Sequence, residues 1–127
     1  MPKRTLFALA CLCMSQVWAD DAFRNHRYDS FRATKVTNQS VVFVGNSITN
    51  MQPWAEIFTA DNVINRGNSG GFSWEVLANI QSYITGRPKK LFIMIGTNDM
   101  NVAGYTPEAV VKNVRQTIKH IQKESPA

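Results

Sequence analysis

The stretch VVFVGNS, residues 41–47, is the clearest strand-and-turn signal in the chain. Its first four residues are β-branched or aromatic and a glycine follows, and a continuous apolar run of this kind is typical of a strand inside a parallel sheet. Two further apolar runs, 63–64 and 91–95, end in the same manner, at Asn65 and at Gly96. We therefore predict three buried strands, each followed by a polar loop.

The segments that follow these strands have helical patterns. Residues 53–59 and 73–85 place apolar side chains at helical spacing, and Ser73 is a suitable N-cap for the second of them. A third helix is predicted to begin after Thr106, a suitable N-cap, with Pro107 in its first turn. This alternation predicts an α/β fold in which helices cover both faces of a parallel sheet.

The first nineteen residues read as a signal peptide. Lys3 and Arg4 precede an apolar run over residues 6–14, and Val17 and Ala19 supply small side chains for a cleavage site. The run is about half of the ~20 apolar residues that a membrane-spanning helix needs. We therefore expect a secreted or periplasmic protein with no stable membrane insertion after signal cleavage.

The cysteines and the net charge exclude several kinds of site and partner. Cys11 and Cys13 are the two cysteines, and both lie in the predicted leader, so neither a disulfide framework nor a thiolate metal site is expected. The formal net charge is +5, but the basic residues are scattered from Arg24 to Lys123 rather than gathered in a stripe. Nucleic acid is therefore not an expected partner.

Residues 20–39 give the weakest signal. The segment is polar and carries isolated aromatic residues, among them Tyr28 and Phe31. We expect a lead-in, part short helix and part linker, that covers the edge of a core.

Three loops follow the three predicted strands, over residues 45–50, 65–71 and 96–101. All are rich in glycine, asparagine and serine, which are also ordinary turn residues. The carboxyl ends of parallel strands lie at one edge of a sheet, where ligands bind in open α/β folds. The sequence therefore predicts a polar site at this edge.

Three blocks of the chain resemble the first three sequence blocks of the SGNH hydrolases, or GDSL esterases: residues 41–50, 65–71 and 93–99. Residues 45–48 read GNSI where that family usually has GDSL, and residues 96–99 match its third block, GTND, at every position. The resemblance covers about residues 40–123. It implies a three-layer α/β/α fold with a flavodoxin-like parallel sheet, and a partial SGNH hydrolase domain over residues 40–127 that stops after the third strand-helix unit.

The resemblance implies ester hydrolysis through a serine acyl-enzyme, without a metal or cofactor. Ser47 matches the family nucleophile, and Gly70 and Asn98 match the donors that, with the Ser47 N–H, stabilise the tetrahedral oxyanion. The sequence looks closest to carbohydrate and sialate O-acetylesterases, which favours a small-molecule or glycan ester as substrate. No oligomeric state is predicted.

Three polar residues near the predicted site are candidates for substrate contact: Asn46, Arg66 and Asp99. Asn46 stands where the family usually has aspartate. Arg66 could bind an acidic sugar, but pairing with Asp99 or with solvent is the alternative we favour. Trp54 and Trp74 are expected in the core rather than as platforms for a sugar.

The general base is missing from the sequence. The family takes it from an Asp-x-x-His block, which does not occur here, and His26 and His120 are the two histidines. We therefore expect either a truncated fragment or a disabled homologue, and negligible esterase activity from this chain. The alternative is a non-catalytic module that binds phosphate, a nucleotide or a sugar, with the glycine-rich loop over residues 67–71 before a helix.

Overall fold

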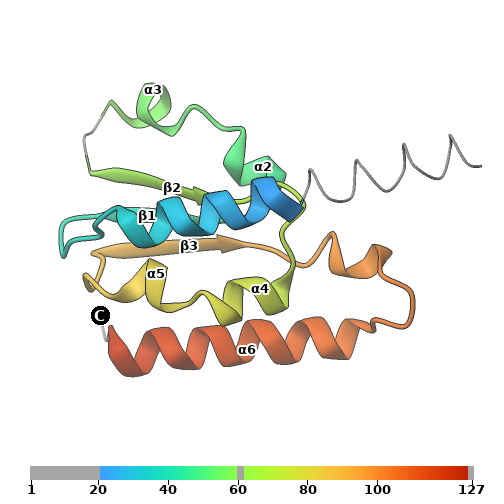
Figure 1. Cartoon of the computed structure of the whole chain (residues 1–127). Helices are drawn as coiled ribbons and strands as arrows, with labels where there is room; N and C mark the ends of the chain where they lie inside the picture. The colour runs from blue at the N-terminus through green and yellow to red at the C-terminus, as the bar shows by residue number, and fades with distance from the viewer. Residues whose placement is uncertain (1–20, 60–61, 126–127) are drawn as a thin grey trace, which may run out of the picture.

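A three-stranded parallel sheet lies at the centre of the structure, a computed structural model that describes residues 21–59 and 62–125 (Figure 1). The strands are β1 (Val41–Gly45), β2 (Val63–Gly67) and β3 (Lys90–Met94). β1 lies in the middle, so that the order is β2-β1-β3. The predicted signal peptide, with Cys11 and Cys13, lies outside the described residues.

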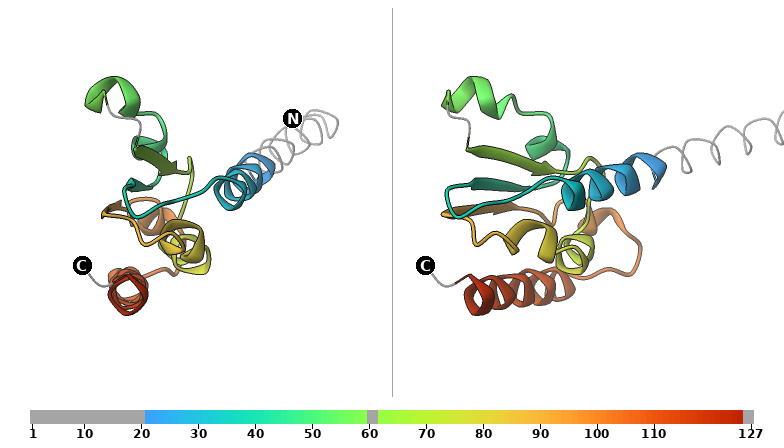
Figure 2. Two further views of the ribbon diagram at one scale, coloured as in Figure 1. Left: turned by 90° about the vertical axis from the view of Figure 1, so that its left-hand side faces the viewer. Right: turned by 60° about the vertical axis from the view of Figure 1, so that its left-hand side comes forward.

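Helices follow each strand. The helical elements are residues 21–33, α2 (Ser47–Asn50), α3 (Trp54–Phe58), α4 (Ser73–Ala78), α5 (Gln81–Ile84), the 3-10 helix η1 (Asp99–Asn101) and α6 (Pro107–Glu124). The helix over residues 21–33, α4 and α5 lie on one side of the sheet, and α6 packs against α4 (Figure 2). α2 and α3 lie toward the other side. The predicted α/β fold, three-layered with a flavodoxin-like strand order, is confirmed.

The two faces of the sheet differ in how well they are covered. Val42 and Val44 of β1 point to the first face and are fully buried. They belong to a core that also contains Tyr28, Phe31, Val76, Ile80, Tyr83 and Ile84. On the second face the outer strand β3 exposes Phe92 and Met94, so its burial alternates rather than being continuous.

The helix over residues 21–33 is a larger part of the fold than the expected lead-in. Its Tyr28 and Phe31 rings meet edge to face, 5.8 Å between centroids, and both are buried. Burial raises the pKa of Tyr28 to about 12, because it disfavours the phenolate. This helix therefore covers the first face of the sheet.

The helix predicted over residues 73–85 is divided in two. The break follows α4 at Asn79, whose side-chain amide donates to the Glu75 carbonyl at 2.9 Å and accepts from Arg32 at 2.6 Å. An asparagine that bonds the backbone one turn earlier competes with helix continuation. Two strand ends also differ from the prediction: β2 extends to Gly67, and β3 ends at Met94.

Candidate active site

Ser47 is the first residue of α2, directly after β1, and is half-buried. Asn46 is the N-cap of this helix: its side-chain oxygen accepts from the Ile48 N–H at 3.0 Å. The turn is tight because α2 lies against the strand ends. A Cβ at Gly45 would lie 2.2 Å from Thr49 Oγ1, and one at Gly67 would lie 2.2 Å from the Asn50 nitrogen.

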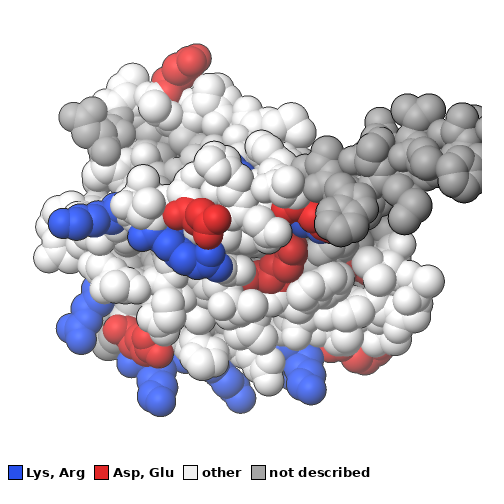
Figure 3. Space-filling view, in the orientation of Figure 1, with Lys and Arg blue, Asp and Glu red and all other residues white. Residues whose placement is uncertain are grey.

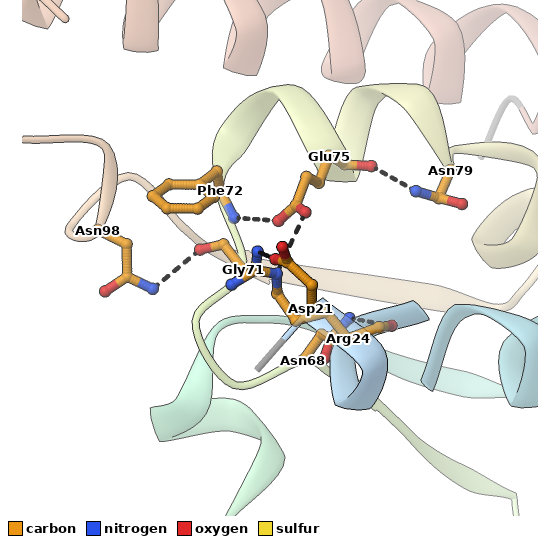
Figure 4. A network of polar contacts seen from close by, with 8 residues as sticks. All are labelled: Asp21, Arg24, Asn68, Gly71, Phe72, Glu75, Asn79 and Asn98. Carbon is orange, nitrogen blue, oxygen red and sulfur yellow. Dashed lines mark hydrogen bonds and ion pairs between the residues drawn. The ribbon is translucent and has the colours of Figure 1, made fainter. Parts of the chain in front are cut away.

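Hydrogen bonds join the three loops that follow the strands. The Asn68 N–H donates to the Gly45 carbonyl at 2.8 Å, and the Asn50 amide donates to Ser69 Oγ at 2.9 Å. The Asn98 amide donates to the Gly71 carbonyl at 3.0 Å (Figure 4). The structure thus brings the surroundings of Ser47, Gly70 and Asn98 together at one edge of the sheet.

Gly70 lies in the second loop and Asn98 in the third, at the edge of the sheet that also carries Ser47. Gly70 has φ +74°, a left-handed conformation that favours glycine. The Asn98 amide nitrogen carries two N–H groups, and its bond to Gly71 uses one of them. The other can donate to a ligand, as an oxyanion hole requires.

A buried polar cluster holds the second loop to the third. Asp99 is fully buried and accepts from the Ser73 N–H at 3.0 and 3.1 Å, and from the Ser73 hydroxyl. Asn113 of α6 donates to Ser73 Oγ at 2.9 Å and also to the Tyr105 hydroxyl. The cluster therefore connects α4, η1 and α6 behind the loops that carry Gly70 and Asn98.

The helix over residues 21–33 holds the second loop from the other side. Asn68 donates to the Arg24 carbonyl at 3.0 Å, and the Arg27 guanidinium donates to the Gly67 carbonyl at 2.9 Å. Arg24 also forms ion pairs with Glu75, at 3.5 Å, and with Asp21 (Figure 4).

Glu75 is the acceptor for the first turn of α4. It accepts from the Phe72 N–H at 2.9 Å. Burial raises the pKa of the Glu75 carboxyl, while the Phe72 hydrogen bond and Arg24 oppose that shift.

The three candidates for substrate contact, Asn46, Arg66 and Asp99, all have internal hydrogen-bond partners in the structure. All three are buried. Arg66 donates to the Thr34 hydroxyl at 2.6 Å and to the Thr34 carbonyl at 2.9 Å, with its guanidinium over the Phe31 ring. It therefore pairs neither with Asp99 nor with solvent, and burial lowers its pKa.

Several residues of the site were missed by the sequence reasoning. Ser73 was predicted to be the N-cap of its helix, but the N-cap is Phe72, and Ser73 binds Asp99. The sequence gives no sign that three other residues belong to the site: Arg24, Asn113 and Tyr105. Their local sequence predicts only a helix or a loop. Their roles depend on contacts between distant parts of the chain.

No base lies beside Ser47 in the described part of the chain. His26 is exposed on the helix over residues 21–33, and His120 is exposed in α6. Within residues 21–59 and 62–125 the Ser47 hydroxyl makes no hydrogen bond to an imidazole or a carboxylate. The turn that carries Ser47 is present, and a group that could take the serine proton does not contact it among these residues.

The glycine-rich second loop is a poor phosphate site. The Ser73 N–H, at the start of α4, donates to the Asp99 carboxylate, and the Phe72 N–H donates to Glu75. These are the N–H groups that a phosphate at a helix N-terminus would use. Two carboxylates occupy their place and would repel an anion.

Among the described residues, no group of three or more His, Cys, Asp or Glu is placed to hold a metal ion. No helix in that part of the chain is long and apolar enough to cross a bilayer.

Comparisons with known proteins define the fold class. No protein-family model matches the chain, and no curated protein does. A solved structure described as a "putative platelet activating factor from Streptococcus pneumonia" is similar over 94% of this chain, with a TM-score of 0.74 and 23% sequence identity. The chain spans 56% of the length of that structure. At this identity the likeness shows the shared α/β fold.

Proposed function

We propose that the chain is part of a serine ester hydrolase of the SGNH type. Ser47 is the nucleophile, and the Ser47 N–H, the Gly70 N–H and the Asn98 amide form the oxyanion hole. The observation that carries the proposal is the set of three hydrogen bonds that join the loops around these residues. Two of these bonds use asparagine side chains to hold one loop to the next, which supports a shaped site at this edge.

The proposed reaction has two halves. The Ser47 hydroxyl oxygen attacks the ester carbonyl carbon and its proton passes to a base; the tetrahedral intermediate then collapses, and the leaving oxygen takes that proton from the base and departs as the alcohol. Water, giving a proton to the base, then attacks the acyl-enzyme; the carboxylic acid is released and Ser47 recovers its proton from the base. In both steps charge develops on the carbonyl oxygen, and fixed N–H donors stabilise it by about 2.7–4 kcal/mol each.

The substrate that we propose is a small acyl ester, such as an acetyl group, on a carbohydrate. The loops at the sheet edge offer amide and hydroxyl groups, which suit a polar alcohol. A cleaved leader, as predicted from the sequence, would carry the protein out of the cytoplasm, where glycan esters are available. No metal or cofactor takes part in the proposed reaction.

One observation favours a second candidate, a sugar-binding module without catalysis. In the described residues Ser47 has no base, and a serine is a weak nucleophile without one. The two candidates differ in whether Ser47 becomes reactive once a base is supplied.

Chemical rescue with imidazole separates these candidates. The chain alone is expected to hydrolyse p-nitrophenyl acetate at a negligible rate. Added imidazole is expected to raise the rate of the wild-type chain above that of Ser47→Ala, whose rate reports the imidazole background. Ser30→Ala, at a serine on the helix over residues 21–33, should behave as wild type.

Mass spectrometry after treatment with a fluorophosphonate in imidazole provides a second readout. We expect the adduct on Ser47. Equal rescue in wild type and Ser47→Ala, with no adduct on Ser47, would overturn the esterase proposal. A clear Ser47-dependent rate without imidazole would instead contradict the expectation that this chain is inactive.

A further inference from the structure

Basic residues that are scattered along the sequence gather at α6 and the neighbouring residues 87–90, which together we call the basic surface. These two segments contain seven of the fourteen Lys and Arg residues and two of the nine acidic residues. The rest of the chain has seven basic and seven acidic residues, so the whole formal net charge of +5 belongs to the basic surface. Lys and Arg side chains accordingly follow α6 in the space-filling view (Figure 3).

Four cations form a line along α6: Lys112, Arg115, Lys119 and Lys123. They lie three or four residues apart, a spacing that places side chains on one side of a helix. All four are exposed. At about 1.5 Å of rise per residue, the line extends over roughly 16 Å.

The basic surface continues from the end of α6 into the turn before β3. Arg87 and Lys123 line one hollow on the surface. Lys89 and Lys90 line a neighbouring hollow together with Ile121 of α6. The two segments therefore form one continuous surface although they are far apart in the sequence.

Carboxylates do not neutralise this surface within the part of the chain that the structure describes. The ion pairs among residues 21–59 and 62–125 are those of Arg24 and Arg32, both outside the basic surface. Glu124, one of the two acidic residues of α6, accepts from the Gln81 amide at 2.8 Å. The cations are therefore available to an external anion.

The shape and composition of the basic surface favour a linear chain as the partner. Neither α6 nor residues 87–90 contain an aromatic residue, whereas single-stranded nucleic acids are bound by stacking on aromatic side chains. Helices that lie on a bilayer carry large apolar side chains beside their cations, and the exposed apolar residues of α6 are Val111 and Ile118. Lys and Arg side chains supply the charge and the N–H donors that carboxylates along a narrow chain require.

We propose that the basic surface binds a linear anionic polysaccharide, a chain of sugars that carry carboxylates. α6 begins after Thr106, beyond the loop that carries Asn98, and runs back along the sheet (Figure 1). A chain bound along α6 therefore leads to the edge that carries Ser47, Gly70 and Asn98. The role of this chain as the carrier of the acyl ester rests on the proposed function.

Fluorescence anisotropy of a labelled oligogalacturonide, a linear chain with one carboxylate on each sugar, tests the proposal. At physiological ionic strength the wild-type chain is expected to bind this probe. Unlabelled polygalacturonate should displace it, and neutral dextran should not.

A matched pair of lysine variants locates the binding. Lys119→Gln is expected to weaken it about two- to fivefold, as the loss of one exposed charge contact would. Lys35→Gln is the same change at an exposed lysine outside the basic surface, and should alter the affinity by less than about twofold because distant surface charges are screened by salt. The triple variant Lys112→Gln, Arg115→Gln and Lys119→Gln should lose about tenfold or more.

The test is independent of the esterase proposal. Oligogalacturonide carries no acyl ester, so its binding needs no reaction at Ser47. The ester p-nitrophenyl acetate is uncharged, so Lys119→Gln should keep the imidazole-rescued rate of the wild type. Binding without rescue would sink the esterase proposal alone, and rescue without binding would sink the polysaccharide proposal alone.

Three results would overturn the polysaccharide proposal. One is a failure of polygalacturonate to displace the probe better than dextran does. Another is equal weakening by Lys119→Gln and Lys35→Gln. The third is competition by phosphatidylserine vesicles or by a single-stranded oligonucleotide that equals or exceeds that of polygalacturonate at the same concentration of charge, which would assign the surface to a membrane or to a nucleic acid.

Discussion

Two glycines at the strand ends allow α2 to lie directly against the sheet. Gly45 and Gly67 are opposite one another in the β1–β2 register. The Cβ that either one lacks would overlap α2, which begins at Ser47. The position of the candidate nucleophile therefore depends on these two glycines. A side chain is excluded there by neighbouring atoms and not by the backbone φ angle.

Gly45→Ala tests this dependence. Its Cβ would lie 2.6 Å from the Met94 carbonyl oxygen as well as against Thr49, so backbone must move. We expect a loss of at least about 3 kcal/mol in the free energy of unfolding, at the upper end of overpacking costs. Urea unfolding followed by circular dichroism measures it.

Gly104→Ala is the matched control. Gly104 has φ +79° and open space around its missing Cβ, so the cost is backbone strain alone, about 1–2 kcal/mol. Equal losses for the two variants would show that α2 can move away from the sheet at little cost.

Asp99 supplies acceptors for Ser73. Asp99→Ala leaves the Ser73 N–H and hydroxyl without an acceptor in a buried place, which should cost about 1–3 kcal/mol. Asp99→Asn keeps one acceptor oxygen and should cost clearly less. Urea midpoints of the two variants give the order, and an Asn variant as unstable as the Ala variant would point to the carboxylate charge instead.

At the scale of elements, the helix over residues 21–33 is part of the core. Phe31→Ala should lower the free energy of unfolding by about 3–5 kcal/mol, as for other buried aromatic residues. Phe23→Ala, on the exposed side of the same helix, should change it by less than about 0.5 kcal/mol. Thermal unfolding of the two variants measures both losses. If Phe31→Ala destabilises the protein as little as Phe23→Ala does, this helix is only loosely attached to the core.

Glu75 couples this helix to α4 in a manner that depends on pH. Its pKa is raised on folding from the usual 4.5, mainly by burial, so the folded state holds a proton that the unfolded state releases. The contribution of Glu75 is therefore most favourable at low pH and declines as the pH rises from about 4.5 through the folded pKa. Asp21, Asp99 and Arg24 also act on this carboxyl.

Glu75→Gln removes that titration and keeps an acceptor for the Phe72 N–H. The melting temperature of the variant minus that of wild type should become more positive as the pH rises from 4.5 toward 7. A difference that is constant with pH, or that falls, would contradict the raised pKa.

The elements differ in how far the sequence predicts them. β1 was predicted closely because four apolar residues and a glycine define a strand and its end locally. The break between α4 and α5 was not, since the Asn79 side chain bonds both the preceding turn and Arg32, a residue far away in the sequence. Distant partners of this kind leave no periodic pattern.

At the scale of the whole molecule, the sheet edge was predictable and its interior connections were not. The parallel order of the strands places Ser47, Gly70 and Asn98 at one edge, as expected from the loops alone. Arg66 lies near the end of β2, and Asp99 lies in η1 after β3. The same reasoning therefore made both of them candidates for substrate contact. Their burial depends on Thr34 and Ser73, which the sequence did not associate with them.

The hydrogen bonds that fix the three loops to one another use backbone carbonyls, backbone or side-chain amides and a serine hydroxyl, none of which titrates in the ordinary pH range. These three hydrogen bonds between the loops should therefore persist from mildly acid to mildly alkaline solution. Whatever pH profile a reaction at Ser47 shows then belongs to the base that is supplied to it. With a series of added bases of different pKa, the pH profile of the Ser47-dependent rate should therefore shift according to the pKa of each base.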